Sequence, residues 1–310
     1  MLSVIIPSYD EQENISKSVR AIGGILASAD IEYEMVFVDD GSRDNTWREI
    51  ASASEKDGRV RGVSFSRNFG KEAAIFAGLA AAKGDCAVVI DCDLQHPPEK
   101  IPDMYGLWLL GYEVVEGVKS DRGEESAARG LAAKAFYALM GRAVDIDMSR
   151  ASDFKLLDRK AIDALLAMPE RNSFFRALSS WIGYRTASVE YAVRERESGS
   201  SKWSTFALIK YALSNISSFS ALPMQIVTAL GLLTLAVSLF FGAIALYQKI
   251  RGVSLGGFTT VILLIGFIGS IIMISLGIIG YYIARIYDEV KGRPRYIISS
   301  TTENPRVWRV

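Results

Sequence analysis

Short apolar runs alternate with amphipathic stretches along the first 120 residues of the chain. Four runs bounded by polar turns are typical of buried strands: 2–7, 34–38, 60–64 and 87–90. The stretches between them have the spacing of helices: 13–29, 46–56 and 71–82. This alternation predicts an α/β fold, Rossmann-like, with a mostly parallel sheet covered on both faces. Ligands of such sheets bind at the carboxyl ends of the strands.

The pattern changes in the last third of the chain. No Asp, Glu, Lys, Arg or His occurs in the 38 residues 211–248, or in the 33 residues 252–284. Helices over 222–247 and 258–284 each exceed the roughly 20 residues that cross a bilayer. Because the connector 248–257 is short, we expect 222–284 to form an antiparallel transmembrane hairpin, with both termini on one side of the membrane. Gly266, Gly269, Gly277 and Gly280 permit close helix approach within the hairpin or between protomers, so a homo-oligomer remains open.

The distribution of basic residues predicts which side of the membrane the two ends of the hairpin occupy. The tail 285–310 carries six basic residues and the connector only Lys249 and Arg251, which places the tail and the first domain in the cytoplasm. The first domain is expected over 1–202, and an amphipathic juxtamembrane helix over 203–221. An ordinary core helix at 203–221 is the alternative.

Composition excludes several classes of function. The whole chain has 35 basic and 35 acidic residues, and no long basic run interleaved with aromatics, which argues against a nucleic-acid partner. No GxGxxG or GxxxxGK[ST] sequence follows a predicted strand, which disfavours a nicotinamide-dependent oxidoreductase or a P-loop enzyme. Cys86 and Cys92 lack metal-site spacing and are expected to be buried thiols.

Carboxylates gather instead at three predicted strand ends. They occur in PSYDEQEN from residue 7, in VDDGSRDNT from residue 38 and in DCDLQHPP from residue 91. So much negative charge at one edge needs a cation or hydrogen-bond donors to offset it. Asp91 and Asp93 place two carboxylates on the same side of an extended segment, and Gln95 adds a neutral oxygen. Hard oxygen ligands of this kind suit Mg²⁺ or Mn²⁺ bridging a diphosphate.

These motifs, with FSRNFGKEAAIFAGL, ASDFKLLDRKAI, MPERNSFFRALSSWIGYR and RERESGSSKW, resemble the family 2 glycosyltransferases of the GT-A fold. The similarity is strongest to polyisoprenyl-phosphate glycosyltransferases, such as bactoprenol glucosyltransferases and dolichol-phosphate mannose synthases. It extends over nearly the whole chain, including the two apolar spans. One departure is Asp10, where that branch more often has Asn.

The resemblance implies a nucleotide-sugar site. Its nucleoside-binding residues would be Pro7, Tyr9, Glu11, Asp39 and Asp40, with Asp39 a candidate for recognising uracil. Gly70 and Lys71 would lie against the donor, Asp91 would contact its ribose or sugar, and Asp93 and Gln95 would hold the metal. His96, the one histidine in the chain, is expected to have a structural role, with a catalytic base as the alternative.

The resemblance also implies an acceptor site. Asp153 matches the acidic position that the family places under the donor sugar, where it would act as a base or hold the acceptor. A helix N-cap is its alternative role. The residues expected to bind the diphosphate or the acceptor phosphate are the cations Arg122, Arg129, Lys134, Arg194, Arg196 and Lys202, and the hydroxyl of Ser201. For each cation, attraction to anionic lipid headgroups is the alternative.

The expected activity is therefore metal-dependent, inverting transfer of a monosaccharide from a nucleotide sugar to a polyprenyl phosphate. UDP-glucose and undecaprenyl phosphate are the expected substrates. Mannosyl, GlcNAc, galactosyl and aminoarabinosyl transfer remain open. A processive polysaccharide synthase is disfavoured because the Gln-x-x-Arg-Trp signature is missing. A catalytically silent membrane scaffold is the non-enzymatic alternative.

Overall fold

The computed structural model describes residues 1–119, 152–168, 170, 174–192, 222–252 and 258–303. The chain divides into two compact units. One is formed by Met1–Ser204 with Pro294–Val310, and the other by Thr205–Arg293. The predicted helix over 203–221 lies outside the described residues.

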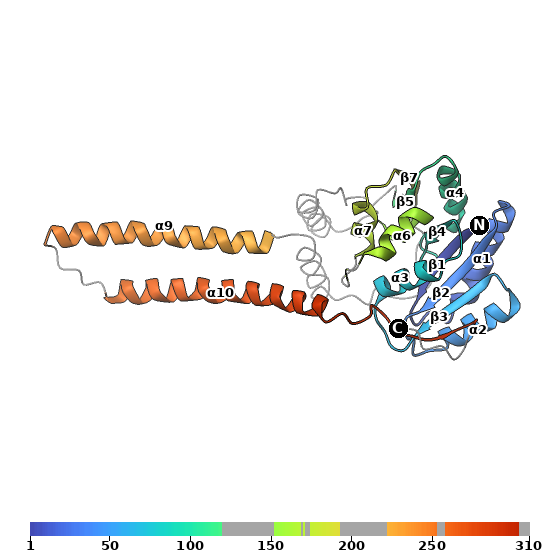
Figure 1. The fold of residues 1–310 in the computed structure, drawn as a ribbon, viewed down its shortest axis with the longest axis horizontal. Coiled ribbons are helices and arrows are strands. Elements are labelled where there is room, and N and C mark those ends of the chain that lie inside the picture. The colour runs from blue at the N-terminus through green and yellow to red at the C-terminus, as the bar shows by residue number, and fades with distance from the viewer. Residues whose placement is uncertain (120–151, 169, 171–173, 193–221, 253–257, 304–310) are drawn as a thin grey trace. The chain divides into compact units, whose positions relative to one another are not determined.

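Eight strands of the described residues form one sheet, and they span Leu2–Ser8 (β1), Tyr33–Asp39 (β2), Val60–Phe65 (β3), Cys86–Val89 (β4), Val114–Lys119 (β5), Lys155–Asp158 (β6), Thr186–Tyr191 (β7) and Ile298–Thr301 (β8). Their order is β7-β5-β6-β4-β1-β2-β3-β8 (Figure 1). β1 to β4 run parallel, so their carboxyl ends share one edge. β6 is antiparallel to β4 and β5, β7 is parallel to β5, and β8 is antiparallel to β3. The predicted mostly parallel sheet is confirmed.

Helices of the first unit cover both faces of this sheet, and those described span Ile15–Ser28 (α1), Thr46–Lys56 (α2), Lys71–Ala81 (α3), Ile101–Leu109 (α4), Arg159–Ala167 (α6) and Phe175–Trp181 (α7), with a 3₁₀ turn at Pro98–Lys100 (η1). Buried side chains of α1, α2 and α4 join the core on the face of the sheet that carries Val4 and Met35. α3 packs on the opposite face, where a Cβ at Gly78 would collide with Ile5. This glycine therefore lets α3 approach the sheet closely.

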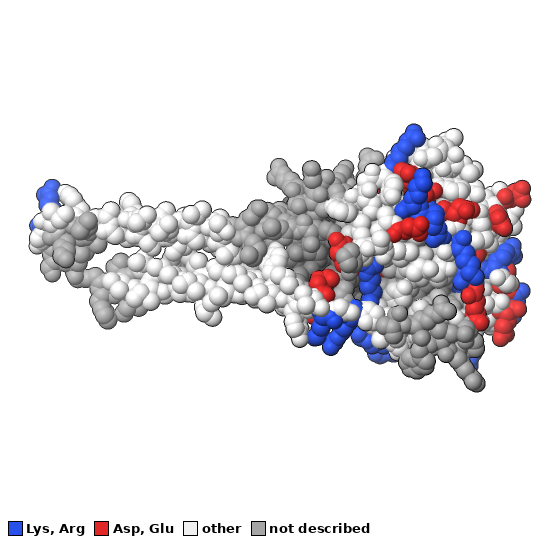
Figure 2. Space-filling model, viewed as in Figure 1, with Lys and Arg blue, Asp and Glu red and all other residues white. Residues whose placement is uncertain are grey.

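The second unit holds two helices, Leu222–Ile250 (α9) and Phe258–Val290 (α10). They have 29 and 33 residues, and each contains a window of mean hydropathy 2.2. Only 6% of the window in α9 and none of that in α10 is buried, so neither resembles the core helix of a soluble domain. Almost no charged side chains appear along these helices (Figure 2). Both are long and apolar enough to cross a membrane.

The predicted elements match the observed ones within a few residues. The helix expected over 46–56 is α2, and the expected strands are β1 to β4. Four strands were not predicted: β5, β6, β7 and β8. The last of them, β8, pairs with the edge strand β3. Its four residues, Ile-Ser-Ser-Thr, lack the alternating apolar pattern that identifies a strand from sequence.

Candidate functional site

The topology of the sheet brings four acidic segments to one edge. β1 and β2 end together, since Ser8 pairs with Asp39. β6 enters the sheet beside β4 in the opposite direction, with Lys155 paired to Val89. The residue two positions before Lys155 therefore lies near the residue two positions after Val89. These residues are Asp153 and Asp91, which are 62 positions apart in the sequence.

A lysine joins these two carboxylates. Lys71 Nζ lies 2.6 Å from Asp91 Oδ1 and 2.8 Å from Asp153 Oδ2. On its other side, Asp153 accepts two hydrogen bonds from Arg176, from Nε at 2.6 Å and from Nη2 at 2.9 Å. The side chain of Asp153 is only 6% exposed. A buried carboxylate between two cations is stabilised in its charged form.

The electrostatics follow from this arrangement. Burial opposes the charge on Asp153, but Arg176 and Lys71 outweigh it and hold the pKa of this carboxyl well below its usual range. Burial likewise opposes the charge on Lys71, and Asp91 and Asp153 together raise its pKa. With so low a pKa, Asp153 is a weak proton acceptor and a strong anchor for cations.

Glu72, the next residue of α3, behaves differently. Burial and the charge of Asp153 raise the pKa of Glu72 to about 7. Its Oε2 accepts the backbone N–H of Phe175 at 2.8 Å, at the first residue of α7. Glu72 therefore fixes the end of the helix that carries Arg176.

Asp39 and Asp40 at the end of β2 organise two neighbouring loops. Asp39 accepts the hydroxyl of Ser64 at 2.8 Å and the amide of Ser42 at 3.0 Å. Asp40 accepts the amides of Phe69, at 2.6 Å, and Gly70, at 2.9 Å. Burial raises the pKa of Asp40, and these amides partly offset the shift. The segment just before Lys71 is thus tied to the end of β2.

The loop after β1 carries the other predicted nucleoside-binding residues. Pro7 is buried in β1, and Tyr9 and Glu11 are partly exposed beyond it. Asp10 has a φ of 55° and is held by Ser42 and by the amide of Arg43. Asn and Asp tolerate the left-handed region better than other side chains, so Asp is suited to this position.

The predicted metal ligands, Asp93 and Gln95, lie on the turn after β4. Asp93 Oδ1 accepts the amide of Gln95 at 3.1 Å, and Leu94 between them has a φ of 55°. Within the described residues no three acidic, histidine or cysteine side chains converge as a closed metal cage. One carboxylate and one amide oxygen suit Mg²⁺ or Mn²⁺ that completes its shell with substrate phosphates and water. The residues present therefore fit a metal shared with a diphosphate.

His96, which follows this turn, packs against two aromatic rings. Its ring stacks on Phe154 at a centroid distance of 5.3 Å and meets the Tyr191 ring edge-on at 5.7 Å. The side chain is 12% exposed, and burial lowers its pKa. A neutral, stacked imidazole agrees with the structural role expected from the sequence.

Comparison with known proteins identifies the family. The profile of "Glycosyl transferase family 2" matches residues 3–166. The chain belongs to glycosyl transferase family 2. One relative, an uncharacterized glycosyltransferase of Synechocystis sp., is 37% identical over 300 residues, covering 96% of this chain and 94% of that protein. A bactoprenol glucosyl transferase of Shigella flexneri, derived from prophage SfII, is 36% identical over 302 residues, covering 97% and 98%. A solved glucosyl-3-phosphoglycerate synthase of Mycobacterium tuberculosis has a TM-score of 0.47 at 24% identity, covering 71% of this chain and 80% of that one.

Several residues predicted for this family 2 glycosyltransferase lie outside the described residues. They are the residues expected at the diphosphate and the acceptor: Arg122, Arg129, Lys134, Arg194, Arg196, Ser201 and Lys202. Of the other predicted residues, Lys71, Asp91 and Asp153 form one cluster, and Asp40 contacts Gly70 beside it. The alternative N-cap role of Asp153 is excluded, because strand β6 follows it and Asp158 caps α6.

Sequence reasoning did not identify Arg176 and Glu72. Arg176 lies within the motif MPERNSFFRALSSWIGYR, yet its partner Asp153 is 23 residues earlier in the chain. Glu72 follows a predicted donor-site lysine in a helix, where an acidic residue is common. No spacing rule pairs either residue with its partner, because both contacts depend on where the tertiary fold places α7.

Proposed function

We propose that this family 2 glycosyltransferase transfers one monosaccharide from a nucleotide sugar to a polyprenyl phosphate. The products are a polyprenyl-phosphate-linked sugar and a nucleoside diphosphate. The observation that carries the proposal is the cluster at the sheet edge, in which Lys71 contacts both Asp91 and Asp153. The same chain contains two helices apolar enough to cross a membrane.

The donor is proposed to bind at the carboxyl ends of β1, β2 and β4. Pro7, Tyr9, Glu11, Asp39 and Asp40 are the proposed nucleoside-binding residues. Gly70, Lys71 and Asp91 are assigned to the diphosphate and sugar. The positive end of α3 and the Lys71 ammonium both favour a bound anion there. These two features support a donor that carries negative charge next to its sugar.

A single displacement is the proposed reaction. An oxygen of the lipid phosphate attacks the anomeric carbon, the bond from that carbon to the diphosphate oxygen breaks, and configuration inverts. A phosphate monoester is already largely ionised at neutral pH, with a second pKa of about 6, so little proton removal is needed. The low pKa of Asp153 agrees with a positioning role, in which it orients Lys71 and Arg176. Arg176 and Lys71 would in turn stabilise phosphate charge.

Asp93 and Gln95 would hold Mg²⁺ or Mn²⁺, which would neutralise charge on the departing diphosphate. A divalent ion needs few protein ligands when substrate phosphates complete its shell. Asp93 and Gln95 already share a turn through the Gln95 amide. This proposal gives the acidic turn a function without requiring further protein carboxylates.

A membrane-bound acceptor accounts for the apolar helices. A polyprenyl chain stays in the bilayer, so its phosphate must be met at the membrane surface. The names of the Shigella relatives, which are bactoprenol glucosyl transferases similar over nearly the whole chain, support this acceptor and glucose as the sugar. We place the first unit and both termini in the cytoplasm, from the charge excess of residues 285–310. Undecaprenyl phosphate and UDP-glucose are the first substrates to test.

A donor screen tests the proposal. Full-length protein in detergent would be incubated with undecaprenyl phosphate, Mn²⁺ and one radiolabelled sugar nucleotide at a time: UDP-glucose, UDP-GlcNAc, UDP-galactose or GDP-mannose, with a UDP-linked aminoarabinose as a fifth donor. We expect label from UDP-glucose in the organic phase. Label from another donor would correct the sugar, and label from none would refute the transferase function and favour a silent scaffold.

A variant pair links that activity to the proposed site. Asp93→Ala should abolish transfer while the protein stays folded. Asp103→Ala is the matched control, because this exposed carboxylate on α4 contacts only Lys100 in the described salt bridges. Normal transfer by folded Asp93→Ala would contradict the proposed role of the turn.

A further inference from the structure

The chain beyond α10 returns to the catalytic unit as an extended segment. We call residues 295–303 the C-terminal strap. α10 ends at Val290, and by Arg295 the chain already contacts Met168, just after α6, and Phe76 in α3. Its middle forms β8 on the edge of β3, with the Ser66 amide bonded to Ile297 O at 3.0 Å (Figure 1). The strap therefore belongs structurally to the unit that carries the site.

The beginning of the strap supports the segment in front of Lys71. The Tyr296 ring stacks on Phe65 with centroids 5.0 Å apart and planes 12° from parallel. Phe65 meets the Phe69 ring edge-on at 5.7 Å. The amide of Phe69 donates to Asp40 at 2.6 Å, followed by that of Gly70 at 2.9 Å. Three aromatic rings thus connect the strap to the loop assigned to the donor.

Arg295, the residue before Tyr296, contacts the helix that begins at Lys71, α3. Its guanidinium lies 4.6 Å above the centre of the Phe76 ring in α3 and bonds to the carbonyl of Met168. Phe76 packs edge-on against Phe175, whose amide is held by Glu72. Two adjacent strap residues therefore contact Phe76 within α3 and Phe65 beside the loop that precedes this helix.

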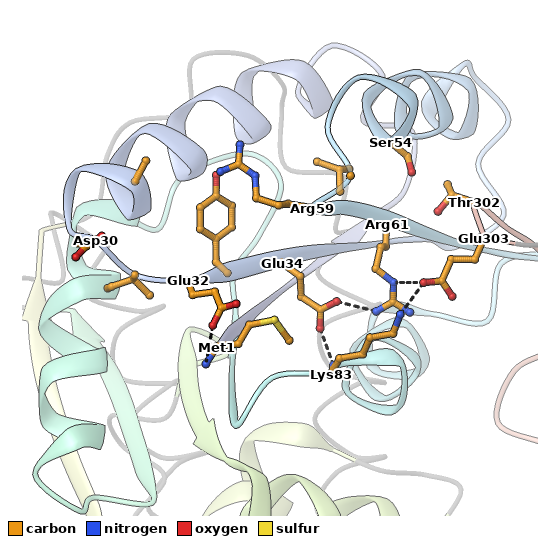
Figure 3. Close-up of a pocket in the computed structure, with 15 residues that line it drawn as sticks. Met1, Asp30, Glu32, Glu34, Ser54, Arg59, Arg61, Lys83, Thr302 and Glu303 are labelled. Carbon is orange, nitrogen blue, oxygen red and sulfur yellow. Dashed lines mark hydrogen bonds and ion pairs between the residues drawn. The ribbon is translucent and has the colours of Figure 1, made fainter.

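The far end of the strap is fastened by polar contacts at the amino-terminal end of the sheet, away from the donor loop. Thr302 exchanges hydrogen bonds with Gly62 at 3.0 Å. Glu303 accepts from Arg61 at 2.8 Å and from Lys83 at 2.7 Å, and Arg61 also binds buried Glu34 at 2.7 Å (Figure 3). Between the two ends, a hollow of about 460 Å³ separates the strap from the alanine-rich face of α3. The strap is therefore held mainly at its ends and along β3.

We propose that the C-terminal strap positions the donor site, and that Tyr296 is the positioning residue. Its stack on Phe65 fixes Phe69, and Phe69 sets the amides that hold Asp40 and precede Lys71. Without the Tyr296 ring, the loop 65–70 loses its outer support and binds the nucleotide sugar less well. This inference rests on the proposed nucleotide-sugar function and adds to it a part for residues beyond the membrane helices.

Full-length Tyr296→Ala in detergent tests the inference, with the wild-type protein measured first in the transfer assay. We expect the KM for the nucleotide sugar to rise roughly tenfold, since a tenfold change equals about 1.4 kcal/mol and an aromatic pair contributes up to that amount. The KM for the lipid should not change. Tyr296→Phe keeps the stacked ring and should behave as wild type. Glu303→Gln loosens the far end, and should lower thermal stability without changing the donor KM.

The outcomes separate this inference from the proposed function. Wild-type protein that neither transfers sugar nor binds UDP with Mn²⁺ by calorimetry would overturn both. Active wild type with an unchanged donor KM in folded Tyr296→Ala would overturn the strap inference alone. If Tyr296→Ala does not fold, Tyr296→Leu keeps apolar packing without the stack, and a wild-type donor KM in that variant would equally overturn it. A tenfold rise in both Tyr296→Ala and Glu303→Gln would show general loosening, and would also contradict a specific role of Tyr296.

Discussion

Glu72 offers a quantitative test of the cluster, through the pH dependence of stability. Its pKa is raised to about 7 by burial and by Asp153, against an ordinary value of 4.5. Between pH 4.5 and pH 7, Glu72 therefore keeps its proton in the folded protein but has lost it in the unfolded chain. Stability from this group is therefore complete below pH 4.5 and is lost as the pH rises through 7.

The size of the effect follows from the two pKa values. Their difference corresponds to about 3 kcal/mol between the protonation states. Because Glu72 is partly exposed, solvent screening reduces this, and we expect about 1 to 2 kcal/mol. For a unit of roughly 200 residues, that is a fall in Tm of about 2 to 8 °C between pH 5 and pH 8.

Glu72→Gln isolates the contribution. Glutamine stays neutral, and its carbonyl oxygen can still accept the Phe175 amide, so the helix α7 keeps its anchor. Thermal unfolding of the full chain, followed by tryptophan fluorescence from pH 5 to 8, should show a smaller decline in the variant than in the wild type. Glu55→Gln, at an exposed position in α2, is the control. Equal declines in wild type and Glu72→Gln would refute the reasoning.

Three further predictions concern neighbouring groups. Lys155→Met should lower the free energy of unfolding by about 3 to 5 kcal/mol, because the fully buried ammonium lies 2.6 Å from Glu116 and its removal leaves this carboxylate without a cation. The double variant Lys155→Met with Glu116→Leu should recover most of the loss in Tm. Asp153→Asn should lower kcat, while the acid limb of the pH–rate profile stays at about pH 6, where the acceptor phosphate titrates. If the acid limb disappears in this variant, Asp153 is the catalytic base instead. Removal of divalent ions with EDTA should abolish transfer, and Mn²⁺ or Mg²⁺ should restore it; activity that survives dialysis against EDTA would refute metal dependence.

Local pattern was enough to predict much of the fold. The strands β1 to β4 and the helices between them follow from runs of apolar residues and turn-forming residues, which act over a few positions. Parallel pairing is expected because the helix between two consecutive strands carries the chain back across the sheet, so that both strands start at the same edge. The carboxylates at the ends of β1, β2 and β4 could therefore be expected at one edge. The two apolar helices follow from composition alone, since charged residues are excluded from long stretches.

The tertiary structure decided which groups meet at that edge. Asp153 reaches Asp91 only because β6 enters beside β4 in the opposite direction, and no local pattern specifies that neighbour. Arg176 and Glu72 acquire their partners through the packing of α7. The strand β8 has a polar sequence, and it forms because the edge of β3 offers unpaired amides and carbonyls. Contacts of Tyr296 and Glu303 hold the two ends of this segment against the sheet. Strand pairing and ion pairing between distant segments depend on geometry that exists only in the folded chain. The spacing of apolar residues that identifies a helix or a strand is a property of neighbouring residues and can be read from the sequence.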